Sequence, residues 1–181
     1  MRALPTELDG PVLVEPVIHG DERGFFLEAY RRNVFAELGV GDDFVQENQS
    51  RSRRGIVRGM HYQPGMAKLV RCPRGAILDV VVDIRPSSPA FGRWVAAELS
   101  DVNGHQLYVP DGFAHGFCVL SEEADVLYRC SSYYDPEAEG GFAYDDPDVG
   151  IVWPPDLVLV ASPRDQAAPR LAEIRDSLPF D

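Results

Sequence analysis

Hydrophobic residues along the chain occur in short runs, which are rich in β-branched and aromatic side chains. Turn-forming sequences separate these runs, for example Pro-Ser-Ser-Pro at 86–89 and Asp-Val-Asn-Gly at 101–104. Many short strands with frequent turns are typical of an all-β sandwich or barrel. We expect strands at residues 12–18, 24–30, 76–84, 93–99, 105–109, 116–120 and 126–131.

Helical periodicity is confined to two segments. Residues 33–38 form one short candidate, and residues 169–178 form another because Leu171, Ile174 and Leu178 recur at helical spacing. The 181 residues contain no internal repeat and no linker-like tract, and this length suits one domain with a sizeable core. We therefore predict a single all-β domain over residues 1–181, a jelly roll or β-barrel with one or two short peripheral helices, including a short helical segment near the C-terminus.

Composition narrows the range of partners and locations. The chain carries 29 acidic and 17 basic side chains, a formal charge of −12, and such a charge repels nucleic acid and anionic membranes. No apolar run approaches the ~18 residues that a membrane-spanning helix needs. The first ten residues contain no apolar stretch of the signal-peptide type. With three cysteines, an odd number read as reduced thiols, we expect a cytoplasmic protein.

Lysine is almost absent from the chain. Of the 17 basic residues, 16 are arginine and only Lys68 is lysine. A genome-wide bias toward arginine would leave one lysine by chance. A need for a compact ammonium group at this one position would give the same count, because arginine is not equivalent there. The position of Lys68 in the sequence has to decide between the two explanations.

Around Lys68 the chain reads Gly55, five residues, His61-Tyr62-Gln63, four residues, Lys68, six residues and Gly75. This pattern resembles the first motif of the cupin superfamily. In metal-binding cupins this motif reads Gly, five residues, His-x-His, three or four residues, Glu, six residues, Gly. Gly55, His61 and Gly75 match it, whereas Gln63 replaces the second His and Lys68 replaces the Glu. The only lysine therefore occupies the position of a metal ligand.

The second cupin motif, Pro-x-Gly-x-x-His, is matched by residues 110–115. A metal site of this type needs neutral imidazoles and a carboxylate, whereas a protonated lysine has no lone pair to donate and repels a dication. We therefore expect a cupin pocket without a metal, in which the Lys68 ammonium stabilises an oxyanion beside His61. For His115, which ends the second motif, three roles stay open: catalysis, substrate binding, or hydrogen bonding to a neighbour in the site.

Further motifs extend the resemblance over nearly the whole chain. They lie at residues 21–28 (DERGFFLE), 46–50 (QENQS), 58–63 (RGMHYQ), 67–70 (AKLV), 82–85 (VDIR), 110–117 (PDGFAHGF), 128–139 (Y-x-C-x-x-x-Y-x-P-x-x-E), 151–154 (IVWP) and 162–165 (SPRD). Together they resemble the dTDP-4-dehydrorhamnose 3,5-epimerase family, the RmlC-like branch of the metal-free cupins.

The resemblance implies an isomerase that acts on a thymidine-diphosphate 4-keto-6-deoxyhexose without a cofactor. The C4 ketone acidifies the hydrogens on C3 and C5, so epimerisation needs a base, an oxyanion stabiliser and an acid. By resemblance, His61 is the base and Asp165 orients it. Lys68 stabilises the enolate oxygen, and Tyr128 returns a proton to the opposite face. The implied product is dTDP-4-dehydro-L-rhamnose, an intermediate of dTDP-L-rhamnose biosynthesis.

The resemblance also assigns the residues that bind the nucleotide sugar. Tyr134 matches the aromatic residue that stacks on thymine, and regular strand alternation would place it on the face of Tyr128, with Tyr133 on the other face. Arg23 and Glu28 match positions on an N-terminal strand that crosses to the partner subunit, which implies a homodimer with shared sites. The predicted binding residues are Arg23, Phe26, Glu28, Gln46, Glu47, Asn48, Arg58, Lys68, His115, Tyr134, Glu139 and Arg164.

One basic segment offers a place for the diphosphate in this acidic chain. Residues 51–74 hold seven of the 17 basic residues and no Asp or Glu. The overall negative charge therefore does not exclude a small anion bound in a basic pocket. Among Arg51, Arg53 and Arg54, however, at least two are better explained by a solvated basic loop.

Three alternative functions can be distinguished from the double epimerase. A mono-epimerase or keto-isomerase on the same nucleotide sugar would keep most of these residues. A non-catalytic sugar-binding cupin would lack the base or the acid, yet His61, Lys68, Tyr128 and Asp165 are all present. A metal-dependent dioxygenase is disfavoured because Gln63 and Lys68 replace metal ligands.

Overall fold

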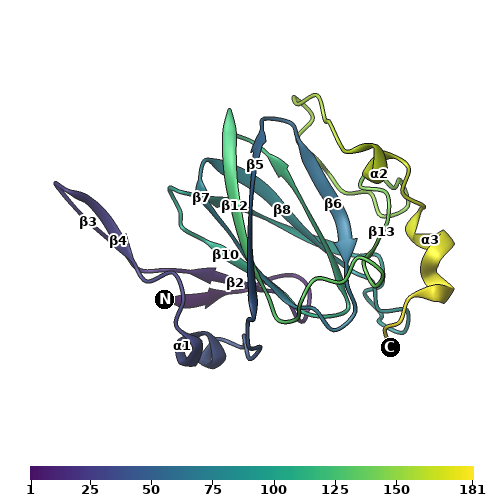
Figure 1. The fold of residues 1–181 in the computed structure, drawn as a ribbon, viewed down its shortest axis with the longest axis horizontal. Coiled ribbons are helices and arrows are strands. Elements are labelled where there is room, and N and C mark those ends of the chain that lie inside the picture. Colours follow the sequence, from purple (N-terminus) through teal and green to yellow (C-terminus); the bar gives the residue numbers. More distant parts are fainter.

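In the computed structural model, which describes residues 1–181, two antiparallel sheets pack face to face and a hairpin projects from one end (Figure 1). The first sheet has the strand order β1-β2-β10-β7-β12-β5 and the second β13-β6-β11-β8-β9. Their strands are β1 (Arg2–Leu4), β2 (Val12–Glu15), β5 (Gln46–Arg53), β6 (Val57–Tyr62), β7 (Lys68–Arg74), β8 (Ala76–Asp83), β9 (Trp94–Ser100), β10 (Gln106–Val109), β11 (Phe113–Val119), β12 (Glu123–Cys130) and β13 (Gly140–Gly141). The predicted all-β, cupin-type fold is confirmed.

Apolar side chains fill the space between the sheets and also cover the outer face of the second sheet. The largest cluster draws Val70 from the first sheet and Ile77 and Phe117 from the second. A second cluster packs Met60 and Trp153 between the second sheet and the C-terminal segment. Because the second sheet is covered on both faces, its central strands form nearly continuous apolar runs, and these are the runs that the sequence pattern detects.

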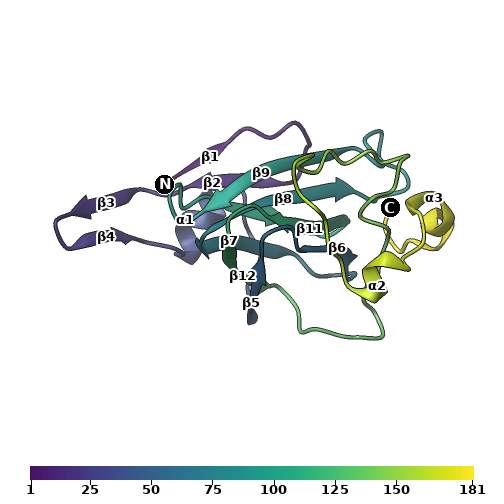
Figure 2. The same cartoon turned by 90° about the horizontal axis from the view of Figure 1, so that it is seen from above.

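The helices are short and peripheral, as Figure 2 shows from above. The expected helices at 33–38 and 169–178 correspond to α1 (Arg32–Glu37) and to α3 (Leu171–Ile174) followed by the 3₁₀ turn η1 (Arg175–Ser177). A third helix, α2 (Pro163–Gln166), was not predicted. None of these helices is long and apolar enough to cross a membrane.

The N-terminal part departs from the expected strands. A strand over 12–18 is wrong, because β2 ends at Glu15 and Pro16 cannot donate a hydrogen bond to a sheet. The chain then forms a separate hairpin of β3 (Ile18–Asp21) and β4 (Gly24–Leu27), which pair only with each other. In both views the hairpin extends away from the two sheets (Figures 1 and 2).

The two glycines of the first cupin motif sit where the backbone leaves no room for a side chain. Gly55 has φ +80°, and a Cβ there would lie 2.4 Å from the Val158 carbonyl oxygen. Gly75 has φ +78°, and its Cβ would lie 2.3 Å from the Glu123 carbonyl oxygen. Gly55 thereby lets the C-terminal segment run against the start of β6, where the Val160 N–H donates to the Gly55 carbonyl at 2.9 Å.

Replacing Gly55 with alanine should destabilise the fold more than replacing Gly65. Both glycines have positive φ, but a Cβ at Gly65 would meet no atom within 4 Å. We expect Gly65→Ala to lower the free energy of unfolding by about 1–2 kcal/mol from backbone strain alone. Gly55→Ala adds a steric clash and should cost about 3 kcal/mol or more. Denaturant unfolding measures both values, and equal losses would contradict the close approach at Gly55.

Candidate active site

One large cavity, of about 820 Å³, opens between the two sheets and collects most of the predicted site residues. Its walls come from strands β5, β6, β7, β11 and β12, and its rim comes from the segments around 134–139 and 160–165. The predicted residues that line it are Gln46, Asn48, Arg58, His61, Lys68, His115, Tyr128, Tyr134, Glu139, Arg164 and Asp165. Residues distant in the sequence thus meet at one concave site, which is where ligand sites are usually found.

A histidine–aspartate pair joins the second sheet to the C-terminal segment. His61 Nε2 lies 2.7 Å from Asp165 Oδ1, and the Asp165 side chain is buried. Burial lowers the pKa of the His61 imidazole below its ordinary value, while the hydrogen bond and charge of Asp165 act in the opposite direction. His61 is therefore neutral near pH 7, and because a carboxylate only accepts, the shared hydrogen sits on Nε2 and leaves a lone pair on Nδ1.

Local structure places Asp165 beside His61 although 104 residues separate them. The C-terminal segment forms a parallel bridge between Ile56 and Val160 next to β6. It then enters α2, where Ser162 caps the helix by accepting the Asp165 backbone N–H at 3.1 Å. The bridge and the cap together fix the carboxylate at the cavity wall.

Lys68 begins β7 on the opposite wall, in the first sheet. It is partly buried and donates no hydrogen bond to any protein group. Burial lowers the pKa of the Lys68 ammonium, whereas Cys130, Glu139 and Asp79 act to raise it. Its nitrogen thus has no fixed protein partner at the cavity, and an ammonium group in this position would suit an oxyanion.

Tyr128 lies on the same wall as Lys68. Strand β12 pairs with β7 so that Cys130 is opposite Lys68, and alternation puts Tyr128, two residues earlier, on the same face. Burial raises the pKa of the Tyr128 phenol, so that its hydroxyl stays protonated at neutral pH. The cavity therefore has a basic imidazole on one sheet and a phenolic acid on the facing sheet.

At the rim, Tyr134 is held by several polar contacts. Its backbone N–H donates to Gln46 Oε1 at 3.0 Å and its hydroxyl to Glu139 Oε2 at 3.1 Å. Arg164 Nη1 donates to the same Glu139 oxygen at 2.6 Å. Burial raises the pKa of Glu139, but the bonds from Arg164 and Tyr134 outweigh it, so that the net shift is downward and the carboxylate is charged.

Gln63 holds the loop that carries Tyr134. Its amide nitrogen donates to the Tyr133 carbonyl at 2.9 Å and its oxygen accepts the Asp135 N–H at 2.9 Å. The residue that replaces the second cupin histidine therefore supports the rim of the cavity.

Regular strand alternation was expected to place Tyr134 on the face of Tyr128. Strand β12 ends at Cys130, however, so the alternation does not reach Tyr134. The expected outcome nevertheless holds. Tyr134 lines the cavity, whereas Tyr133 does not and is 73% exposed.

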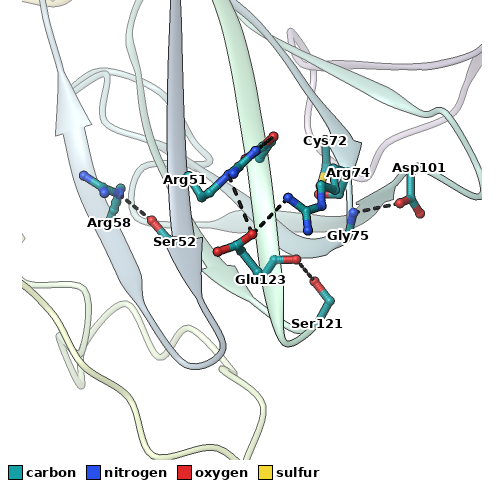
Figure 3. A network of polar contacts seen from close by, with 10 residues as sticks. Arg51, Ser52, Arg58, Cys72, Arg74, Gly75, Asp101, Ser121 and Glu123 are labelled. Carbon is teal, nitrogen blue, oxygen red and sulfur yellow. Dashed lines mark hydrogen bonds and ion pairs between the residues drawn. The ribbon is translucent and has the colours of Figure 1, made fainter.

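Most of the basic segment 51–74 does not face the cavity. Figure 3 shows Arg51 and Arg74 converging on Glu123, with Glu123–Arg74 at 3.0 Å. Arg51 also donates to Asp125 at 2.6 Å. Only Arg58 and Lys68 of the seven basic residues line the cavity, and Arg58 Nε donates to Ser52 Oγ at 3.1 Å. Acidic residues of β12 therefore pair with two of the seven basic residues, Arg51 and Arg74. The basic side chains of the cavity are Arg58, Lys68 and Arg164.

His115 is both a cavity residue and one member of a buried pair. Its Nε2 lies 2.7 Å from Asp79 Oδ1 on β8, and it is the register partner of His61 across β11 and β6. Of the three roles left open for His115, hydrogen bonding to a neighbour is seen directly. Its place in the cavity keeps a role toward substrate open as well.

Four predicted binding residues lie outside the cavity of the single chain. Strand alternation turns Glu47 away, and it accepts a hydrogen bond from Arg129 Nε at 2.9 Å. Arg23 and Phe26 belong to the projecting hairpin, and Glu28 follows it and pairs with Arg31. For these four residues the structure offers no contact with the cavity, and their roles stay predictions.

Three residues of the site were missed by the sequence reasoning. Asp79 supports His115, Ser162 caps the helix of Asp165, and Gln63 braces the rim. A signal for Asp79 was present, since it is an acid inside the apolar strand Ala76–Asp83. A charge at such a position is unusual unless it has a partner.

The pKa of His61 should lie below its ordinary value of 6.5. The imidazole is therefore neutral, and able to accept a proton, at all pH values above that. Asp165→Asn removes a charge that favours the imidazolium, so the pKa should fall further. Titration of the imidazole signals by NMR measures both values, with the exposed Asp156→Asn as a control that should change nothing. A His61 pKa above 6.5 in the unchanged protein would contradict this environment.

Comparison with known proteins is consistent with this geometry. A sequence model described as dTDP-4-dehydrorhamnose 3,5-epimerase matches residues 5–173. The dTDP-4-dehydrorhamnose 3,5-epimerase of Salmonella typhimurium is 46% identical over 94% of this chain and 96% of its own length. The dTDP-4-dehydrorhamnose 3-epimerase of Streptomyces niveus is 44% identical over 98% of this chain and 87% of its own.

A solved structure gives the same result for the fold. The dTDP-6-deoxy-D-glucose-3,5-epimerase RmlC of Legionella pneumophila, crystallised with dTDP-4-keto-L-rhamnose, superposes with a TM-score of 0.94 at 46% identity. The match covers 99% of this chain and 98% of that one. The predicted family, isomerase class and cupin-type fold are thereby confirmed, and the chain belongs to the dTDP-4-dehydrorhamnose 3,5-epimerase family.

Proposed function

We propose that the chain inverts C3 and C5 of dTDP-4-dehydro-6-deoxy-D-glucose and so forms dTDP-4-dehydro-L-rhamnose for dTDP-L-rhamnose biosynthesis. The observation that carries this proposal is the arrangement of three groups in one cavity. His61, bound to Asp165 of the C-terminal segment, lies on one sheet, and Lys68 and Tyr128 lie on the sheet that faces it. Inversion at carbon requires a base and an acid on opposite faces of the sugar ring, and the two sheets supply them.

His61 takes the proton in the first step. Its Nδ1 lone pair accepts the hydrogen from the carbon next to the C4 ketone, and the electron pair of the broken C–H bond becomes part of an enolate. The imidazolium that forms is stabilised by Asp165 at 2.7 Å. The lowered pKa of His61 keeps the base unprotonated before the reaction, and the carboxylate limits how weak a base it becomes.

Lys68 and Tyr128 complete the step. The negative charge of the enolate rests on the C4 oxygen, where the unpaired ammonium of Lys68 stabilises it. Tyr128 then transfers its phenolic proton to the carbon from the other wall, which leaves the inverted centre and a phenolate. Exchange with solvent returns His61 and Tyr128 to their starting states. The groups that react all come from the protein, so the proposed chemistry needs no cofactor.

The rest of the cavity suits the nucleotide. Arg58 and Arg164 are cations placed to meet the diphosphate, and the half-exposed ring of Tyr134 offers a flat face for the base. Gln46 and Asn48 add hydrogen-bonding groups on β5. Stacking and amide contacts of this kind do not by themselves distinguish thymidine from uridine. The proposed site of action is the cytoplasm, since Cys72, Cys118 and Cys130 are all free thiols.

The active form is proposed to be a homodimer in which the hairpin of one chain reaches the partner. The aromatic rings of Phe25 and Phe26 are 63% and 70% exposed on this hairpin. A two-stranded hairpin by itself is marginally stable in water, and exposed aromatic residues favour a protein surface as their contact. Arg23, Phe26 and Glu28, which lie outside the cavity of their own chain, would then act in the site of the partner.

A mono-epimerase is the second candidate function. It is favoured by one observation, the 44% identity to a 3-epimerase. The proposed base and acid serve either reaction, so the number of inverted carbons must be measured. A sugar-binding protein without activity would not need the His61–Asp165 pair opposite Tyr128.

The chain should introduce deuterium from D₂O at both C3 and C5 of the sugar. Because Tyr128 exchanges its proton with solvent, each inversion replaces one carbon-bound hydrogen by deuterium. NMR of the product, trapped by a 4-reductase, reports both positions. His61→Asn should lower both exchange rates about 10³-fold. Deuterium at C3 alone would establish the mono-epimerase, and unchanged turnover by His61→Asn would overturn the proposed base.

Removing the aromatic side chains of the hairpin should dissociate the dimer. The double variant Phe25→Ser, Phe26→Ser should sediment as a monomer at concentrations where the unchanged chain is a dimer, and its KM should rise. Val158→Ser serves as the matched control, because Val158 is 86% exposed but lies outside the hairpin. A double variant that remains dimeric would show that the hairpin does not hold the subunits together.

A further inference from the structure

A second imidazole–carboxylate pair lies next to the first on the same sheet. His115 Nε2 and Asp79 Oδ1 are 2.7 Å apart, the same separation as in the His61–Asp165 pair. His115 and His61 are register partners on neighbouring antiparallel strands, so that their side chains project to the same face of the sheet. One wall of the cavity thus carries two histidines, each bound to its own carboxyl group.

The surroundings of the two pairs differ. The Asp79 side chain is 0% exposed and the His115 side chain 8%, against 26% for His61. Asp79 Oδ2 is buried and has no hydrogen-bond partner, and no Arg or Lys forms an ion pair with Asp79. The one hydrogen bond of this carboxyl group therefore goes to the imidazole of His115.

A buried pair of this kind favours the state with no net charge. An ionised carboxylate facing a neutral imidazole would leave a negative charge without an ion-pair partner in the core, which is strongly unfavourable. In agreement, burial raises the pKa of Asp79, although His115 and Lys68 act against this rise. One extra proton on the pair removes the charge, whether it is drawn as carboxylic acid with imidazole or as carboxylate with imidazolium.

We propose that Asp79 is a positioning residue that shares a proton with His115 Nε2 and so keeps a hydrogen on His115 Nδ1, which donates to the C4 oxygen of the enolate beside Lys68. In both ways of drawing the neutral pair, Nε2 is occupied by the Asp79 bond and Nδ1 carries a hydrogen. The choice of the C4 oxygen as acceptor rests on the proposed function. The hydrogen on His115 Nδ1 is inferred from the contact with Asp79 and does not depend on that function.

The two histidines then have opposite tasks. His61 uses Nε2 for its bond to Asp165 and presents the Nδ1 lone pair to the substrate, whereas His115 shares the proton at Nε2 with Asp79 and presents an N–H. The groups that face His115 from the strands around it are His61 on β6, Asp79 on β8 and Lys68 on β7 of the opposite sheet. A second donor at the C4 oxygen would share with Lys68 the charge that develops in the enolate.

Nitrogen NMR of the intact protein, labelled with ¹⁵N-histidine, tests the proton directly. At pH 7.5 the Nδ1 of His115 should be protonated in the free protein, with the signal assigned by its loss in His115→Gln. Asp79→Asn, whose amide can donate to Nε2, should keep the Nδ1 hydrogen. An Nδ1 without a proton in the unchanged protein would overturn the proposal, whatever the enzyme turns over.

Turnover separates positioning from mere structural support. Asp79→Ala should lower kcat roughly 10²-fold, the usual effect of losing one oxyanion donor, with KM changed less than about threefold. Asp79→Asn should keep kcat within about tenfold of the unchanged chain. Asp83→Asn is the control, because Asp83 is also buried on β8 but bonds to Arg85 and Ser88 outside the cavity. A folded Asp79→Ala variant with unchanged kcat would contradict the proposal. If that variant does not fold, the NMR spectra of the unchanged protein and of Asp79→Asn test the proposal instead.

If the unchanged protein does not invert the sugar, the proposed function is wrong. The NMR measurement of the hydrogen on His115 Nδ1 does not depend on that result. The two failures are therefore distinguishable.

Discussion

A partly buried lysine side chain without an ion-pair partner is the constraint around which this site is organised. The ammonium of Lys68 lies in the cavity between the sheets, where burial opposes its charge. Arginine in the same place would be larger and would extend a planar fork into the cavity. The nearby carboxylate of Glu139 acts to keep the ammonium charged, but it is not bound to it. In the proposed reaction, the enolate that forms would supply the missing partner of this ammonium.

The two-sheet architecture explains how such a site can invert a carbon. Each group that we propose to react is fixed on a strand or a capped segment: His61 on β6, Lys68 on β7, Tyr128 on β12, and Asp165 at the start of α2. Groups on rigid elements keep their geometry while the proton moves. The sheets face each other across the cavity, so the proposed base and acid would approach a bound ring from opposite sides.

The sequence predicted the parts of the fold that are apolar and missed those that are polar. Strands β8 and β11 are buried on both faces and were found as apolar runs, whereas β5, with the sequence QENQSRSR, turns polar side chains into the cavity and shows no such signal. The site residues were reached through motifs. Spacing alone could not pair His61 with Asp165, 104 residues away, because that contact depends on the bridge at Val160 and the cap at Ser162. Asp79 belongs to no motif and lies inside the apolar strand β8, so the sequence pattern does not reveal its contact with His115.

The central claim is that a single cavity holds the sugar between His61 and Tyr128. A crystal structure with a dTDP-6-deoxyhexose that has a hydroxyl in place of the C4 ketone, and so cannot react, tests it most directly. We expect the ring to lie between the two sheets, with the C4 oxygen at the Lys68 ammonium, His61 on one face and Tyr128 on the other. A sugar bound outside the cavity, or with His61 and Tyr128 on the same face of the ring, would contradict it.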